Sequence, residues 1–115
     1  MPRLVWAMKF IDRNFHDSSL SLLTVSGSAG LSLWYLSRSF PLHVGIGYRD
    51  YLRLIRLRQA AKLLTTTPIC IKGIASSVGY KHLSDFYRHF KTEYKSSPAE
   101  FRRKRTEIIC LPDLY

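Results

Sequence analysis

The chain has 115 residues and a formal net charge of +10, with 18 Lys and Arg against 8 Asp and Glu. Its 46% hydrophobic share excludes an intrinsically disordered basic tail, because such tails lack the apolar surface that folding requires. Two cysteines match neither a disulfide framework nor a zinc spacing, and no signal peptide or bilayer-spanning run is present, so we expect a cytoplasmic protein without metal, cofactor or membrane contact.

The first half of the chain predicts three helices. Apolar residues recur at three- and four-residue steps from Leu4 to Phe15, which is typical of an amphipathic helix. Ser21 can cap a short helix that ends at Gly30, and Ser32 can cap the next. The expected helices are therefore Leu4–Phe15, Leu22–Ala29 and a third that starts at Leu33.

Pro41 predicts the end of that third helix. Proline has no N–H to donate to the carbonyl of Ser37, and it biases Phe40 away from helical backbone angles. We therefore expect the helix to stop or kink near Phe40.

The second half predicts four more helices. The longest uninterrupted helical pattern is followed by the run Thr65-Thr66-Thr67-Pro68, and Gly79 closes the short helix after it. Period-two alternation long enough for a strand is absent. The fold is therefore expected to be all-α with about seven helices, the last four being Tyr48–Leu64, Ile71–Val78, His82–Tyr94 and Pro98 to about Arg105.

The chain also contains an internal repeat. At an offset of 49, and of 50 after one extra residue, apolar, small and glycine positions coincide in two copies, each with the pattern of a helix-turn-helix. The predicted organisation is a first helix-turn-helix subdomain over residues 1–47, a linker helix over 48–65, a second subdomain over 66–105 and an unassigned tail over 106–115. The coinciding pairs are Leu22 and Ile71, Val25 and Ile74, Ser26 and Ala75, Ala29 and Val78, Gly30 and Gly79, Leu36 and Phe86, Arg38 and Arg88, Phe40 and Phe90.

The repeat and the charge together favour double-stranded DNA as the partner. A linker helix of about 17 residues is roughly 25 Å long, which would let a monomer place two recognition helices about one DNA turn, roughly 34 Å, apart. Residues 1–47 carry four basic and two acidic side chains, whereas residues 48–115 carry fourteen and six. The basic run Arg102–Arg105 suits either a solvated helix end or a phosphate contact.

With these residues in view, the chain resembles the DNA-binding domain of the AraC/XylS family of bacterial transcription regulators, over about Met8–Arg103. The resemblance implies two recognition helices that enter adjacent major grooves, a role in transcription regulation, and RNA polymerase and a separate effector-binding or dimerisation domain as further partners. Three departures from the family pattern are Pro41, which implies a shortened first recognition helix, Lys95 in place of a glycine and Gly47 in place of a capping serine. The matching residues are Leu31–Phe40, Tyr51–Leu57, Ala60, Leu63, Leu64, Ile71, Ile74, Ala75, Val78, Gly79, Tyr80, Ser84, Phe86, Arg88, Phe90, Lys91, Ser97, Pro98, Phe101 and Arg102.

The outward residues of the two recognition helices are the candidates for reading bases. Arginine can donate two hydrogen bonds to guanine, serine can contact any base, and an aromatic or aliphatic side chain can pack on a thymine methyl group. Trp34 has partial burial as its alternative, Arg38 a surface ion pair and Leu83 plain helix packing. The candidate base readers are Trp34, Ser37, Arg38, Leu83, Ser84, Tyr87 and Arg88.

The candidate phosphate contacts are Lys91 and three arginines of the linker helix, Arg49, Arg53 and Arg56, which share one helix face. A solvated face is the alternative for the three arginines, and Arg56 has a further alternative as a brace that donates hydrogen bonds between subdomains.

Catalysis is not expected, because the histidines form no zinc spacing and the carboxylates form no obvious acid–base pair. Asp85 is expected to favour the N-terminus of the second recognition helix. The competing functional hypotheses are a DNA-targeting or protein-interaction module that serves a larger protein or enzyme, and non-specific binding to RNA or an anionic membrane.

Overall fold

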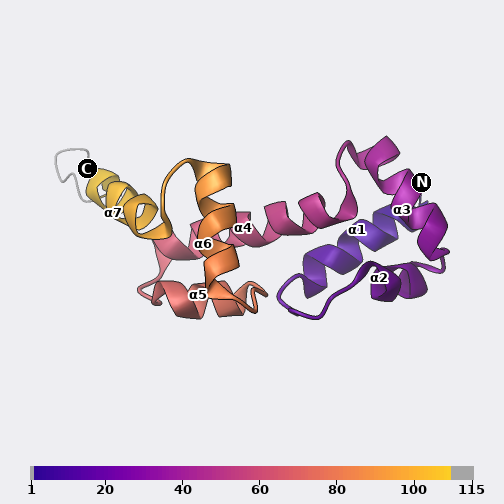
Figure 1. Ribbon diagram of the computed structural model, residues 1–115, viewed down its shortest axis with the longest axis horizontal. Coiled ribbons are helices and arrows are strands. Elements are labelled where there is room, and N and C mark those ends of the chain that lie inside the picture. Colours follow the sequence, from indigo (N-terminus) through magenta and orange to yellow (C-terminus); the bar gives the residue numbers. More distant parts are fainter. Residues whose placement is uncertain (1, 110–115) are drawn as a thin grey trace. The chain divides into compact units, whose positions relative to one another are not determined.

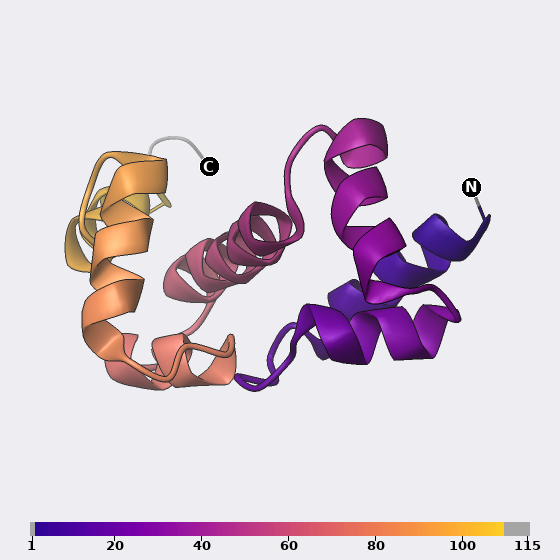
Figure 2. The same ribbon diagram turned by 45° about the vertical axis from the view of Figure 1, so that its right-hand side comes forward.

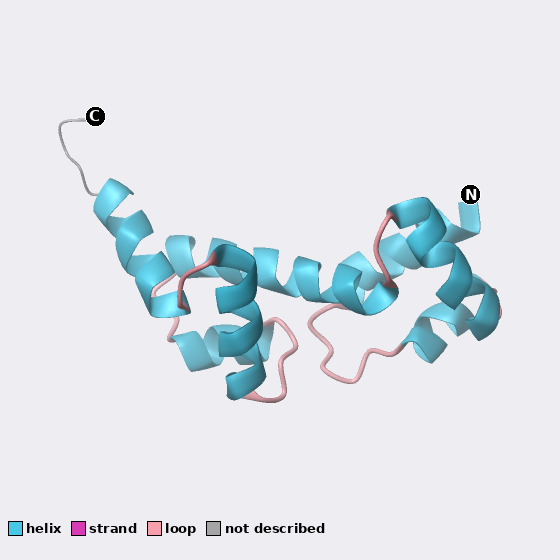
Figure 3. Ribbon diagram, turned by 45° about the horizontal axis from the view of Figure 1, so that its top comes forward, coloured by secondary structure: helices cyan, strands magenta, loops and turns pink. Residues whose placement is uncertain are grey.

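The computed structural model describes residues 2–109, with side chains described for residues 3–104. Within these residues every regular element is a helix (Figures 1 and 3), which confirms the predicted all-α fold. The helices are α1 (Pro2–Asn14), α2 (Leu22–Ala29), α3 (Leu33–Val44), α4 (Tyr48–Thr66), α5 (Ile71–Ser77), α6 (Leu83–Tyr94) and α7 (Pro98–Ile109).

The chain divides into two compact units, and the boundary lies inside α4. Unit 1 extends to Arg56 and contains α1, α2, α3 and the first half of α4. Unit 2 begins at Leu57 and contains the second half of α4 with α5, α6 and α7. The linker helix therefore contributes a packing surface to each unit.

In unit 1, α2 packs against both α1 and α3 (Figure 2). The side chains between them are apolar and almost fully removed from water, and burial of each large one stabilises the fold by about 1.5–3 kcal/mol. Tyr51 of α4 places its ring 5.2 Å from that of Phe40, edge to face. The buried core consists of Leu4, Ala7, Ile11, Val25, Ala29, Leu36, Phe40 and Leu52.

In unit 2, α6 packs against α5 and α7. Phe90 is fully buried, and its ring centroid lies 4.7 Å from that of Tyr94 and 5.4 Å from that of Phe101. Aromatic pairs at these separations contribute beyond the area that they bury. The buried apolar residues of this unit are Leu57, Ala60, Ala61, Leu64, Ile74, Ala75, Val78, Phe86 and Phe90.

The structure gives the internal repeat a physical meaning, since five of its eight pairs consist of two buried residues. The small pair, Ser26 and Ala75, is 3% and 2% exposed, as expected where two helices approach closely. Gly30 and Gly79 both adopt the left-handed backbone, with φ of 69° and 103°, which glycine adopts without steric cost. The five buried pairs are Val25 and Ile74, Ser26 and Ala75, Ala29 and Val78, Leu36 and Phe86, Phe40 and Phe90.

The repeat also extends beyond what we inferred from the sequence. Leu4, Ala7 and Ile11 of α1 have the same spacing as Leu57, Ala60 and Leu64 of α4, and all six are buried. The loop that follows differs in length between the copies, so this correspondence has an offset of 53 and does not appear at 49 or 50. Each unit therefore consists of one supporting helix, a helix-turn-helix and residues of the helix that follows.

The prediction that the third helix stops near Phe40 is wrong, because α3 continues through Pro41 to Val44. The carbonyl of Pro41 still accepts a hydrogen bond from the N–H of Gly45 at 3.0 Å. Phe40 is fully buried and Val44 packs against the same core, so their burial offsets the bond that proline cannot make. The first recognition helix is therefore not shortened.

Helix caps follow the sequence in part. The Oγ of Ser21 and that of Ser32 accept hydrogen bonds from the N–H groups of Thr24 and Tyr35, as predicted. Cys70 caps α5 through its Sγ, 3.4 Å from the N of Gly73, a cap that the sequence analysis missed. By contrast His82 at the start of α6 makes no side-chain cap hydrogen bond.

The last helix is longer than expected. It reaches Ile109, so residues 106–109 of the unassigned tail are helical, and residues 110–115 lie outside the described residues.

Lys95 stands where the family pattern has a glycine, and its backbone is left-handed, with φ of 61°. Among the described residues it is the non-glycine residue with positive φ. The equivalent residue in unit 1 is Gly45, with φ of 96°.

Candidate nucleic-acid interface

The exposed face of α3 carries three of the candidate base readers. Trp34 is 69% exposed, and Ser37 and Arg38 are exposed as well, whereas Leu36 and Phe40 point into the core. The exposure of Trp34 argues against its alternative as a core residue. One face of α3 thus anchors the helix and the other is free to contact a ligand.

With the carboxylates of residues 3–104, Arg38 does not form the surface ion pair that was its alternative. Its guanidinium carbon lies 5.0 Å from the centroid of the Trp34 ring, one helical turn away. A cation over an aromatic face at this distance is attracted by the ring quadrupole, by about 0.5–1 kcal/mol at an exposed site. No hydrogen bond links this guanidinium to another described residue, so its N–H donors remain available for a ligand.

The exposed face of α6 carries the second set of candidates. Ser84, Tyr87 and Arg88 are exposed, whereas Leu83 is half-buried and packs partly against its own unit. Nη2 of Arg88 donates a hydrogen bond to Oδ1 of Asp85 at 2.8 Å. This arginine is therefore oriented by a carboxylate, unlike Arg38.

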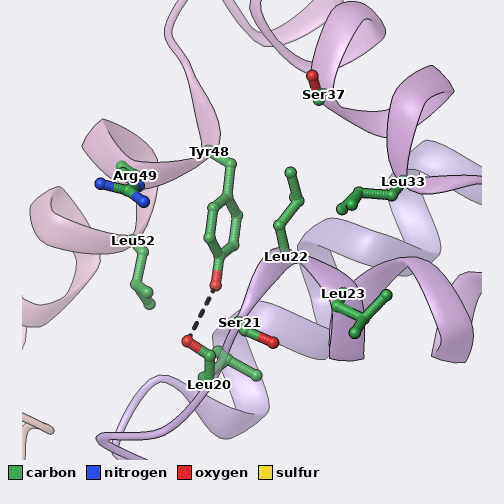
Figure 4. A pocket seen from close by; sticks show the side chains of 9 residues that line it. All are labelled: Leu20, Ser21, Leu22, Leu23, Leu33, Ser37, Tyr48, Arg49 and Leu52. Carbon is green, nitrogen blue, oxygen red and sulfur yellow. Dashed lines mark hydrogen bonds between the residues drawn. The ribbon is translucent and has the colours of Figure 1, made fainter.

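A recess of about 650 Å³ beside α3 brings together one candidate base reader and one candidate phosphate contact. Ser37 and Arg49 both line it, from α3 and α4 (Figure 4). The Tyr48 hydroxyl donates to the carbonyl of Leu20 at 3.4 Å, and burial raises the pKa of Tyr48, which keeps the hydroxyl protonated. The remaining lining residues are Ser21, Leu22, Leu23, Leu33 and Leu52.

The three linker arginines have different surroundings. Arg49 and Arg53 are exposed, and Arg53 makes a long pair with Asp50, at 3.9 Å. Arg56 is half-buried, and its Nε and Nη2 donate to the carbonyls of Phe15 and Asp17, both at 2.8 Å. These bonds favour the bracing alternative for Arg56, with the correction that both carbonyls belong to unit 1.

Arg102 has an equivalent role in unit 2, which the basic run Arg102–Arg105 did not reveal. Its guanidinium donates to the carbonyls of Leu64, Thr67 and Ile69, at 2.9, 3.1 and 2.6 Å. In each unit an arginine of the helix that follows the recognition helix thus fixes the loop before the helix-turn-helix. The signal available in the sequence was the position of Arg102 four residues after Pro98, the buried first residue of α7, and not its charge.

Two carboxylates near loops and helix ends have lowered pKa values. Hydrogen bonds from the hydroxyl and N–H of Ser19 hold the pKa of Asp17 below its ordinary value. The N–H and side chain of Ser97 do the same for the pKa of Glu100. Ser97 and Glu100 form a reciprocal capping box at the start of α7, with N–O distances of 3.0 and 3.2 Å.

Over residues 3–104, no cluster of three or more His, Cys, Asp and Glu side chains is arranged to hold a metal ion. Among the helices of residues 2–109, none combines the length and the apolar character that crossing a bilayer requires.

Comparison with known proteins identifies the family. A family model described as a helix-turn-helix domain, of the AraC/XylS type, matches residues 25–104. The chain belongs to the AraC/XylS family. It is 31% identical to the probable transcription factor PqrA of Proteus vulgaris, over 97% of this chain and 86% of PqrA. It is 29% identical to the transcriptional activator NphR of a Rhodococcus species, over 91% of this chain.

The fold agrees with this assignment to the AraC/XylS family. The C-terminal domain of AraT, a response regulator from Geobacillus stearothermophilus, superimposes with a TM-score of 0.88 at 35% identity, over 91% of this chain and 87% of the AraT chain. The chain spans 31% of the length of NphR but most of PqrA. It is thus a DNA-binding domain of the kind found in transcription regulators.

Proposed function

We propose that this AraC/XylS-type domain regulates transcription by binding double-stranded DNA through two adjacent major-groove segments, one contacted by α3 and the other by α6. The observation that supports the proposal most directly is the pair Arg38 and Arg88. They occupy equivalent positions in the two copies, and both are exposed on a helix whose opposite face is buried. An arginine so placed can donate two hydrogen bonds to guanine O6 and N7.

The other candidate base readers differ in how exposed their side chains are. Trp34, Ser37, Ser84 and Tyr87 are exposed beside the two arginines and remain candidate base readers. Leu83, which is half-buried, can add only an apolar contact.

The phosphate contacts are proposed for the exposed cations Arg49, Arg53 and Lys91. Arg56 is left out, because its guanidinium already donates to two backbone carbonyls. Phosphate contacts supply affinity that weakens with salt, whereas base contacts supply the preference for one sequence.

The experiment is a selection of bound duplexes from a random pool at two salt concentrations. We expect two short preferred blocks about one DNA turn apart, roughly 34 Å. A pool without any preferred sequence at both salt concentrations would contradict the proposal. One block instead of two would restrict base reading to a single unit.

The alternative, a DNA-targeting module within a larger protein, draws support from the 31% of NphR that the chain spans. The proposal also includes a separate effector-binding or dimerisation domain and contact with RNA polymerase. It places the protein on DNA in the cytoplasm. Transcription from a promoter with the selected site, measured with this chain as the added regulator, separates a self-sufficient regulator from a targeting module.

A further inference from the structure

Asp85 is a carboxylate on the face of α6 that we propose meets DNA. Its side chain is 39% exposed, and the Arg88 side chain bonded to it is 68% exposed. A negative charge on such a face is repelled by the phosphates that the surrounding cations attract. Its presence there requires a compensating role.

Stabilisation of the helix terminus is one candidate role, since Asp85 lies in the first turn of α6. A carboxylate in the first turn is stabilised by the helix dipole wherever its oxygens point. The geometry is more specific than that, because Oδ1 of Asp85 accepts a hydrogen bond from Nη2 of Arg88 at 2.8 Å. The dipole does not account for this bond.

The equivalent positions of unit 1 show that the bond is not part of the shared scaffold. Tyr35 occupies the place of Asp85, and Arg38 lies over Trp34 instead of bonding a carboxylate. The ring attracts the guanidinium but gives its N–H groups no carboxylate acceptor such as Asp85 gives Arg88.

We propose that Asp85 is a positioning residue that orients Arg88 for guanine, so that α6 discriminates more strictly than α3. This inference rests on the proposed function. The guanidinium has five N–H donors, and the bond to Asp85 leaves four, which is enough for a bidentate contact with O6 and N7. The fixed geometry lowers the entropy lost when that contact forms. The carboxylate also reduces the attraction of Arg88 for phosphates of any sequence.

The test is a double-mutant cycle with wild type, Asp85→Asn, Arg88→Ala and the double variant. Dissociation constants are measured for the selected duplex, for duplexes with the guanine in the α6 block replaced, and for a random duplex. We expect Asp85→Asn to lower discrimination at that guanine by about 3- to 30-fold, as contacting side chains couple, and to raise affinity for the random duplex. In the Arg88→Ala background it should leave discrimination unchanged.

Two further variants sharpen the result. Asp50 pairs with Arg53 on α4 at the same three-residue spacing, so Asp50→Asn is a matched loss of charge. It should raise affinity for every duplex and leave discrimination unchanged. Asp85→Glu keeps the charge and should retain most of the discrimination, because Glu can still reach Arg88.

Four outcomes would overturn the inference. If the wild type is sequence-specific and Asp85→Asn leaves discrimination unchanged, this inference is overturned while the proposed function stands. An equal loss of discrimination on the Arg88→Ala background means that Asp85 contacts a base itself. A lowered melting temperature together with equally weaker binding to all duplexes means that Asp85 only stabilises α6. A wild type that binds all duplexes equally overturns the proposed function and this inference with it.

Discussion

In unit 1 the exposed arginine of the recognition helix, Arg38, lies over the Trp34 ring, whereas in unit 2 its equivalent, Arg88, is bonded to Asp85. The caps differ too, since Ser32 caps α3 with its side chain and His82 gives α6 no such bond. Five of the eight matched pairs, however, are buried in both copies. Packing therefore constrains the inner face of each copy, while the outer face and the helix ends can differ without changing the fold.

The largest effects are expected from the aromatic anchors Phe40 and Phe90. Each is fully buried, so Phe40→Ala and Phe90→Ala should each cost about 3–5 kcal/mol of unfolding free energy. Each also contacts further aromatic rings, so the two variants should be about equally damaging. Urea denaturation followed by circular dichroism measures both.

Hydrogen exchange shows where each of these two substitutions acts. If the two units unfold separately, Phe40→Ala should accelerate exchange in α1–α3 and Phe90→Ala in α5–α7. Uniform acceleration along the chain in both variants would instead mean that the units unfold together.

The base-reading arginines should come next. Arg38→Ala and Arg88→Ala should each cost about 1–3 kcal/mol of binding free energy at the selected duplex, with little change on random duplexes. Lys91→Ala is the control, since loss of a phosphate contact should weaken all duplexes alike and lower the salt slope. Equal losses on selected and random duplexes for both arginines would contradict base reading by either helix.

The difference in caps predicts a smaller effect. Ser32→Ala removes the acceptor of the Tyr35 N–H and should cost about 1 kcal/mol of unfolding free energy. His82→Ala should cost almost nothing, because no cap bond is lost, and His82→Ser should stabilise α6. Thermal unfolding compares the three variants, and equal destabilisation by both alanine substitutions would contradict the assigned difference.

Substitution of Lys95 should change the free energy of unfolding by about as much as the Ser32 cap or less. It adopts a left-handed backbone that costs a non-glycine residue about 1 kcal/mol, so Lys95→Gly should raise the melting temperature. The matched control is Gly45→Ala at the equivalent turn, which should lower it even though no atom lies within 4 Å of the added Cβ. A Lys95→Gly variant without any gain would contradict strain at this turn.

The smallest effect concerns pH. The pKa of Glu100 is lowered in the folded state, because Ser97 donates hydrogen bonds to its carboxylate. The ionised group therefore stabilises the fold fully above its ordinary pKa of 4.5, and this contribution is lost as pH falls through the lowered value.

Melting temperatures between pH 7 and pH 3 check this dependence. In Glu100→Gln the amide oxygen can still accept from Ser97 but does not titrate, so the variant should lose less stability toward pH 3 than wild type. Identical pH profiles would contradict the assignment.

Much of the fold could be predicted from the sequence, because the periodic apolar residues and the glycines report packing directly. Val25, Leu36 and Phe40 could be matched with their counterparts in the second half from spacing alone, and all are buried. The course of α3 beyond Pro41 could not be predicted, since it depends on how much Val44 gains from a core assembled from distant residues.

The surface shows the limit more sharply. That Arg38 and Arg88 face outward followed from helical spacing, and the structure agrees. Arg56 and Arg102 looked like members of basic rows, but each fixes a loop that is more than 30 residues away in the chain. Local sequence cannot distinguish a cation that awaits a phosphate from one whose donors are already used.

By itself the sequence determined the helical repeat, the buried anchors and the presence of an exposed arginine on each recognition helix, because these follow from side-chain type and a period of 3.6 residues. Only the tertiary structure decided that Arg56 and Arg102 donate to backbone carbonyls more than 30 residues away, whereas the partners of Arg38 and Arg88, Trp34 and Asp85, lie one turn away on the same helix. The reason is that a guanidinium is placed by the acceptors around it, and for Arg56 and Arg102 folding alone brings these acceptors into reach.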